Sequence, residues 1–160
     1  MRRTALFNRG VLTDQPPPAK VRVLLVEDSA ADAYLIREAL EGENLNFDLH
    51  VIQDGEQAAK LLMALENSSQ SWPDVVLLDL NMPRCEGREV LQRIKQTPRG
   101  NSVPVIVITS SNSPADREDV FKLGATSYFR KPSDLNEFLK IGAVVRQTLY
   151  GKSGATKRPA

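Results

Sequence analysis

The chain has 160 residues, a formal net charge of +1, and ordinary shares of hydrophobic (41%) and charged (26%) side chains. This size and composition indicate one domain that can bury a core without disulfides, and the single cysteine, Cys85, excludes an internal disulfide and fits a reducing cytosol. Neither nucleic acid nor a membrane is an expected partner, because the charge is close to neutral and no apolar run approaches the ~20 residues that span a bilayer.

Strand-like and helix-like patterns alternate along the chain. Residues 1–19, which contain three consecutive prolines, predict a disordered arm, residues 20–150 a folded domain, and residues 151–160 a flexible tail. Short aliphatic runs predict strands at 21–26, 49–52, 74–79, 104–109 and 127–129. Amphipathic stretches predict helices at about 30–41, 58–65, 90–96, 114–123 and 135–150, with Ser29 capping the first and a turn at Asp54-Gly55.

Five strands that alternate with five helices predict an α/β fold: a doubly wound, five-stranded parallel sheet with helices on both faces. The strand order 2-1-3-4-5 fits this count and places the first and third strands side by side. The first strand runs into Glu27-Asp28, and the third ends at Asp79. We therefore expect three carboxylates at the carboxyl edge of the sheet, where such folds bind ligands.

Clustered carboxylates need a compensating charge. Two of them about 4 Å apart repel by ~4 kcal/mol at an effective dielectric near 20, and hard oxygen ligands without histidine or thiolate favour Mg²⁺. Phosphoryl transfer suits such a site, and a carboxylate can itself be the nucleophile that forms an acyl phosphate. Thr109 and Lys131, just beyond the fourth and fifth strands, bring a hydroxyl and an ammonium to the same edge.

The combination of Glu27-Asp28, Asp79 in Leu-Asp-Leu-Asn-Met-Pro, Thr109, and Lys131-Pro132 preceded by Tyr128 resembles the receiver domain of two-component response regulators, a flavodoxin-like fold. The resemblance covers about residues 20–150. It implies that Asp79 accepts a phosphoryl group from a phosphohistidine of a sensor histidine kinase. The protein would be a signalling receiver rather than an enzyme, although it takes part in its own Mg²⁺-dependent phosphorylation and dephosphorylation.

The resemblance also assigns roles to the other residues. Mg²⁺ would be bound by Asp28, Asp79 and the backbone carbonyl of Asn81, and by Glu27 through water. Lys131 would pair with the phosphoryl group, Thr109 would move to hydrogen-bond it, and Tyr128 would turn into the space that Thr109 leaves. The Lys131–Pro132 peptide bond is cis in many relatives. Asn81 and Ser111 would flank the path of an attacking water.

Two other functions compete with the phosphorylation switch. A phosphatase or phosphotransferase that uses an aspartyl phosphate usually carries a second carboxylate two residues after the nucleophile, where this chain has Asn81, and a cap insertion that is not visible here. An interaction module that is never phosphorylated is disfavoured by the intact Asp79, Thr109 and Lys131.

The end of the chain indicates how the receiver passes its signal on. Only about ten residues follow the last predicted helix, so we expect a single-domain receiver. In that helix, Ile141, Val144 and Tyr150 fall outside the predicted core stripe of Leu135, Phe138, Leu139, Val145 and Leu149. This pattern predicts a homodimer through the fourth helix, the fifth strand and the fifth helix; alternatively, the tail covers these residues.

A finer resemblance concerns the input. The segment 87–95, the long loop between the second helix and the third strand, and the extended last helix are similar to small receivers paired with bacterial phytochromes. This resemblance implies that light is the signal and that a phytochrome histidine kinase is the partner.

Overall fold

The computed structural model describes residues 19–82 and 86–151. Residues 1–18 of the expected arm, residues 152–160 of the expected tail and Cys85 lie outside the described residues. A single parallel sheet runs through the domain in the order β2-β1-β3-β4-β5, which confirms the predicted topology. Its strands are β1 (Val21–Val26), β2 (Phe47–Ile52), β3 (Val75–Asp79), β4 (Val105–Thr109) and β5 (Ser127–Arg130).

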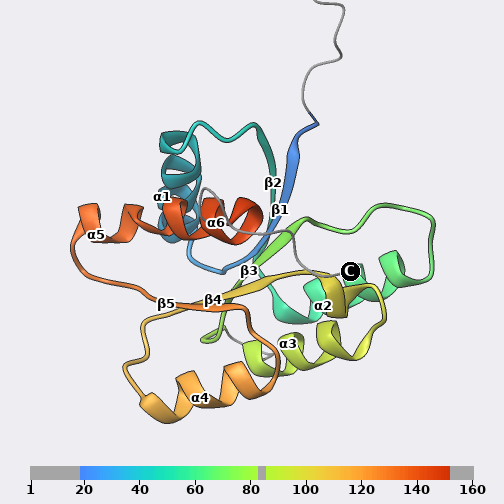
Figure 1. Cartoon of the computed structure of the whole chain (residues 1–160). Helices are drawn as coiled ribbons and strands as arrows, with labels where there is room; N and C mark the ends of the chain where they lie inside the picture. Colours follow the sequence, from blue (N-terminus) through green and yellow to red (C-terminus); the bar gives the residue numbers. More distant parts are fainter. Residues whose placement is uncertain (1–18, 83–85, 152–160) are drawn as a thin grey trace, which may run out of the picture.

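Helices cover both faces of the sheet (Figure 1). One face carries α1 (Ala30–Gly42), α5 (Leu135–Leu139) and α6 (Ile141–Tyr150). The other face carries α2 (Gly55–Glu66), α3 (Gly87–Gln96) and α4 (Pro114–Lys122), with a short 3₁₀ helix, η1 (Gly100–Ser102), after α3. Within the described ranges, no helix combines the length and the apolar character that crossing a bilayer requires.

The core is divided between the two faces of the sheet. Alternate side chains of β1 and β3, such as Leu24 and Leu78, pack under α2, α3 and α4, whereas Leu25 and Leu77 pack under α1 and α6. All residues of β3 and β4 are buried. Strands buried on both faces have continuous aliphatic sequences, which explains why both were recognisable from the sequence.

Asp54-Gly55 is not a free-standing turn. The Asp54 side chain is the N-cap of α2 and accepts a hydrogen bond from Glu56 N at 2.7 Å, so the helix begins three residues earlier than predicted. Ser29 caps α1 as expected, by accepting a hydrogen bond from Asp32 N. Side-chain caps therefore fix the start of both helices.

The last helix differs from the prediction. It is divided at Lys140 into α5 and α6, so its apolar side chains do not follow one continuous helical stripe. Ile141, expected outside the core, is fully buried against α1, and Leu135, expected in the core stripe, is 53% exposed. Gly142 allows this close packing, since a Cβ there would lie 2.3 Å from the Ala39 carbonyl oxygen of α1.

Candidate functional site

The carboxyl edge of the sheet gathers the acidic residues. Because Val26 of β1 is in register with Leu78 of β3, the next residues along the two segments, Glu27 and Asp79, lie side by side. Carboxylate oxygens of Glu27, Asp28 and Asp79 all lie within 4.8 Å of one another. Glu27 and Asp79 are buried, whereas Asp28 is exposed. The expected convergence of the three carboxylates is therefore present.

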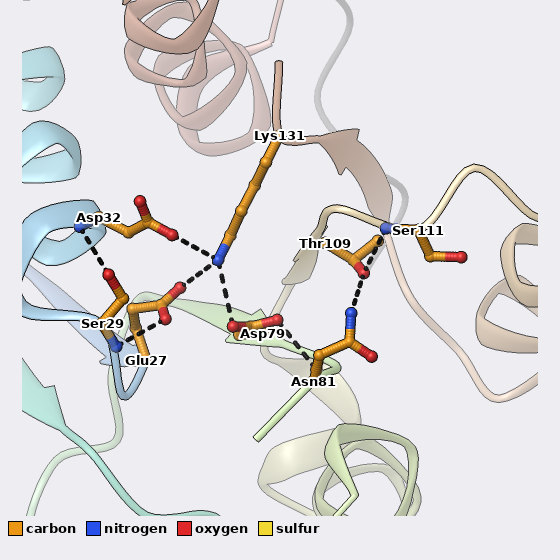
Figure 2. A network of polar contacts seen from close by, with 8 residues as sticks. All are labelled: Glu27, Ser29, Asp32, Asp79, Asn81, Thr109, Ser111 and Lys131. Carbon is orange, nitrogen blue, oxygen red and sulfur yellow. Dashed lines mark hydrogen bonds and ion pairs between the residues drawn. The ribbon is translucent and has the colours of Figure 1, made fainter. Parts of the chain in front are cut away.

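Lys131 supplies a cation to this cluster. Strand β5 lies beside β4, and the Lys131 N–H donates to the Thr109 carbonyl at 2.7 Å. The ammonium then reaches across the edge and donates to Glu27 Oε2 at 2.7 Å and to Asp79 Oδ2 at 3.1 Å (Figure 2). The Lys131–Pro132 peptide bond is trans and thus differs from the cis bond of many relatives. The lysine nevertheless points into the site.

Sequence reasoning missed a third acidic partner of Lys131. Asp32, in the first turn of α1, accepts a hydrogen bond from the ammonium through Oδ2 at 2.7 Å. Asp32 lies four residues after Asp28, just past the N-cap Ser29 of α1. No local feature of the sequence signalled its contact with Lys131, because an acidic residue in a first helical turn is an ordinary preference. Three carboxylates, those of Glu27, Asp32 and Asp79, therefore accept hydrogen bonds from the Lys131 ammonium.

Burial shapes the titration of the two central groups. Burial raises the pKa of Glu27 from 4.5 to about 7, and the nearby charge of Asp79 acts in the same direction; hydrogen bonds from Lys131 and Ser29 N–H oppose the rise. For Lys131, burial would lower the pKa, but hydrogen bonds to Asp32 and Glu27 outweigh it, so the pKa is raised and the ammonium stays charged.

On the other side of Asp79, a polar chain leads to the buried Thr109 (Figure 2). The Asn81 N–H donates to Asp79 Oδ1 at 3.0 Å, and its side-chain amide donates to Thr109 Oγ1 at 3.1 Å. Ser111 N–H donates to the same Thr109 oxygen at 3.1 Å. With two bonds accepted, the Thr109 hydroxyl retains its own hydrogen for donation.

Tyr128 joins this network through Ser111. The half-buried Tyr128 hydroxyl donates to the Ser111 carbonyl at 3.1 Å, and the guanidinium of Arg117 lies 5.7 Å from its ring centroid. The two residues expected to act as a switch, Thr109 and Tyr128, are thus held by the backbone of one intervening residue.

A divalent cation fits the acidic cluster. Three carboxylates contribute oxygen atoms within 4.8 Å of one another, and two of them are buried. Hard oxygen donors of this kind suit Mg²⁺ or Mn²⁺.

Comparison with known proteins defines the family. The model of the response regulator receiver domain matches residues 23–142. The chain therefore belongs to this family, whose shared function is to accept a phosphoryl group. It is similar to response regulator Rcp1 of Synechocystis sp., with 38% identity over 133 residues that cover 81% of this chain and 88% of Rcp1.

Solved structures agree. The phosphorylated cyanobacterial phytochrome response regulator RcpA has a TM-score of 0.75 and 32% identity, and the match covers 84% of this chain and 97% of RcpA. The Mn²⁺-bound form of Rcp1 has a TM-score of 0.72 and 34% identity, covering 87% of this chain and 99% of that one. The receiver domain of sensor histidine kinase PA1611 from Pseudomonas aeruginosa PAO1, with magnesium in its active-site cleft, has a TM-score of 0.64 and 26% identity, covering 84% and 100%.

Proposed function

We propose that this receiver accepts a phosphoryl group on Asp79 from a phosphohistidine of a sensor histidine kinase. The placement of Asp79 carries the assignment. It lies close to the acidic pair that follows β1. Figure 2 shows Asp79 between Glu27 on one side and the Asn81–Thr109 branch on the other, with Lys131 reaching its Oδ2. Asp79 thus has cation-binding groups, an ammonium and a hydroxyl around it.

The transfer is a displacement at phosphorus. An Asp79 carboxylate oxygen forms the new P–O bond while the P–N bond of the phosphohistidine breaks, and the departing imidazole nitrogen takes up a proton. The Lys131 ammonium and the Thr109 hydroxyl donate to the phosphoryl oxygens. Glu27, Asp28, Asp79 and the Asn81 backbone carbonyl would hold Mg²⁺, which supplies further positive charge for those oxygens.

The output is a shift between two conformations. Moving an equilibrium from 1:99 to 99:1 needs about 5.5 kcal/mol of differential interaction. A dianionic phosphoryl group that engages Lys131 and Thr109 contributes to this difference. Ser111 is hydrogen-bonded to both Thr109 and Tyr128, so a movement of Thr109 is passed on to Tyr128. Attack of water on the acyl phosphate regenerates the Asp79 carboxylate and releases phosphate. The protein then acts as a cytoplasmic switch that takes part in its own chemistry.

The proposed input is light through a phytochrome kinase. The support is the similarity to RcpA, described as a phytochrome response regulator, over most of both chains. We expect a phytochrome kinase to transfer a phosphoryl group to this chain in a light-dependent manner. Transfer at the same rate from unrelated sensor kinases would contradict the pairing.

We also propose a homodimer through α4, β5 and the α5–α6 region. Ile141 no longer supports it, because that side chain is buried within the monomer. The remaining support is the exposure of Phe121 on α4 (40%), Leu135 on α5 (53%) and Tyr150 on α6 (62%). Sedimentation with and without beryllofluoride, a phosphoryl mimic, tests this assembly; a monomer under both conditions at high concentration would contradict it.

The central experiment measures phosphorylation directly. The protein is incubated with acetyl phosphate and Mg²⁺, and the added phosphoryl mass is followed by intact-protein mass spectrometry. We expect one phosphoryl group on the wild type and on the control Asp48→Asn, whose carboxylate pairs with Lys20 at the opposite end of the sheet. Asp79→Asn should take none. An unlabelled wild type, or equal labelling of the wild type and Asp79→Asn, would overturn the assignment.

A further inference from the structure

The hydrogen-bond network around Thr109 continues away from Asp79 and onto two helices. Ser111, whose N–H is bound to Thr109, donates its hydroxyl to Asp116 Oδ2 of α4 at 2.5 Å. The other carboxylate oxygen of Asp116 accepts a hydrogen bond from the Arg88 guanidinium of α3. The β4–α4 loop is thereby tied to the first turns of both helices.

The position of Arg88 is fixed by its neighbour Gly87. A Cβ at Gly87 would lie 2.4 Å from the Asp79 carbonyl oxygen, so the first turn of α3 packs directly on the backbone of the phosphoryl-accepting strand. Gly87 N–H also donates to the Leu80 carbonyl at 3.2 Å. The anchor for Arg88 is therefore the same backbone that carries Asp79.

Asp116 is fixed in a similar way on α4. Its backbone N–H donates to the hydroxyl of the N-cap Ser113 at 3.3 Å, which sets the direction of the first turn. The hydrogen bond from Ser111 lowers the pKa of Asp116, and the pairing with Arg88 adds to this effect against the opposing effect of desolvation. The side chains of Arg88 and Asp116 are 35% and 29% exposed, so the pair is partly shielded from solvent.

We propose that Arg88 and Asp116 are positioning residues for phosphoryl acceptance at Asp79. The pair holds Ser111, and the Ser111 N–H and carbonyl in turn hold the hydroxyls of Thr109 and Tyr128. Loss of the pair loosens the loop, so that the Thr109 hydroxyl keeps only the hydrogen bond from Asn81 as a firm contact and its direction toward the transferred group is less well fixed. This inference rests on the proposed function and extends it to two residues that do not touch Asp79 with their own side chains.

The pair also borders the site on the Asn81 side. Arg88 and Asp116 line a hollow of about 180 Å³ together with Leu80, Asn81, Met82 and Glu86. A truncated side chain at either position enlarges this hollow next to Asn81, the residue that links Asp79 to Thr109. The loosened loop and the enlarged hollow both affect the Asn81–Thr109 branch of the site. Neither affects Glu27 and Asp28, which follow β1.

The first test uses Arg88→Gln, Asp116→Asn and the double variant. With acetyl phosphate and Mg²⁺, we expect each single variant to be phosphorylated about threefold to tenfold more slowly than the wild type. The double variant should be no slower than the slower single variant, because both changes break the same contact. Mn²⁺ affinity should stay within about twofold, since the acidic cluster is not altered.

Arg93→Gln is the matched control. Arg93 also lies on α3 and pairs with an acidic side chain, Glu89, but on the surface. The Arg93→Gln variant should be phosphorylated at the wild-type rate. If the wild type itself takes no phosphoryl group, the proposed function fails; if the wild type is phosphorylated and the two single variants match it, only the positioning role fails.

A charge exchange separates positioning from simple stabilisation. Arg88→Asp combined with Asp116→Arg restores an ion pair between α3 and α4, but a guanidinium cannot accept the hydrogen bond of the Ser111 hydroxyl. We expect resistance to urea to return toward the wild-type value while phosphorylation stays slow. Recovery of both properties, or slowing of the single variants only in proportion to their unfolded fraction by circular dichroism, would overturn the positioning role.

Discussion

Asp32 Oδ2 lies 2.7 Å from Lys131 Nζ, as close as Glu27 and closer than Asp79 at 3.1 Å. Asp32 is carried by α1 and Lys131 follows β5, so the pair joins two elements across the carboxyl edge of the sheet. Glu27 and Asp79 are the carboxylates proposed to bind the cation and the phosphoryl group. Asp32 stands outside that set, so its contact with the ammonium does not depend on a group that binds the cation or the phosphoryl group.

Asp32→Asn should slow phosphorylation because Lys131 loses a charged partner that fixes its direction. The amide keeps the shape and a weaker acceptor, so we expect acetyl phosphate labelling with Mg²⁺ to be about threefold to tenfold slower, or ~0.7–1.4 kcal/mol in transition-state stabilisation. Asp32→Glu should recover part of the loss. Glu38→Gln, an exposed change on α1, is the control. An unchanged rate in Asp32→Asn would show that Asp32 does not orient the lysine.

The raised pKa of Glu27 predicts a pH-dependent stability of the metal-free protein. The unfolded chain loses this proton near pH 4.5 and the folded protein near pH 7, so between these values only the folded state holds it. Stability from this group therefore falls as the pH rises through that window. In urea unfolding with a chelator, the wild type should lose about 2 kcal/mol relative to Glu27→Gln between pH 5 and pH 7.5. Parallel pH profiles for the two proteins would contradict this expectation.

The contact of α6 with α1 predicts a steric effect at Gly142. A Cβ there would lie 2.3 Å from the Ala39 carbonyl oxygen and 2.8 Å from its carbon, both of them backbone atoms that cannot move aside freely. Gly142→Ala should reduce the free energy of unfolding by about 1–3 kcal/mol. Gly42→Ala on α1 is the control, because nothing lies within 4 Å of a Cβ there, and it should be neutral or stabilising by up to about 1 kcal/mol. Equal stabilities of the two variants would contradict the packing.

The sheet and its acidic edge were predictable for a physical reason. Strands buried on both faces are aliphatic throughout, and the alternation with helices leaves few topologies. Glu27 directly follows β1 and Asp79 is the last residue of β3, so their meeting point was determined by strand order alone.

Contacts made by helical side chains were not predictable in this way. Asp32 in a first helical turn is an ordinary preference, since acidic side chains favour that end of a helix. Nothing local indicates a partner 99 residues later, at Lys131. Arg88 and Asp116 are likewise 28 residues apart, and their pairing depends on how α3 and α4 lie on the sheet. Lys140, where the helix is divided, is neither glycine nor proline, so the sequence predicted one continuous helix. That prediction placed Ile141 on the wrong face of the helix.

Arg99 organises the loop between α2 and β3, at the opposite edge of the sheet from Asp79. Its guanidinium donates to the carbonyls of Leu65 at 2.8 Å, Ser68 at 2.9 Å and Gln70 at 2.6 Å. The same group lies 5.9 Å from the ring centroid of the buried Trp72. A lysine lacks this planar fork and cannot reproduce the three bonds together.

Arg99→Lys should therefore lower the free energy of unfolding by about 1–3 kcal/mol and shift the Trp72 emission to the red, as the loop opens to water. Arg93→Gln, which breaks an exposed pair, should cost less than about 0.5 kcal/mol. Urea unfolding monitored by fluorescence measures both. Because Asp79 lies at the other end of β3, the rate of phosphorylation by acetyl phosphate should stay at the wild-type value in folded Arg99→Lys. A stable variant with unchanged emission would show that the three carbonyls find other donors.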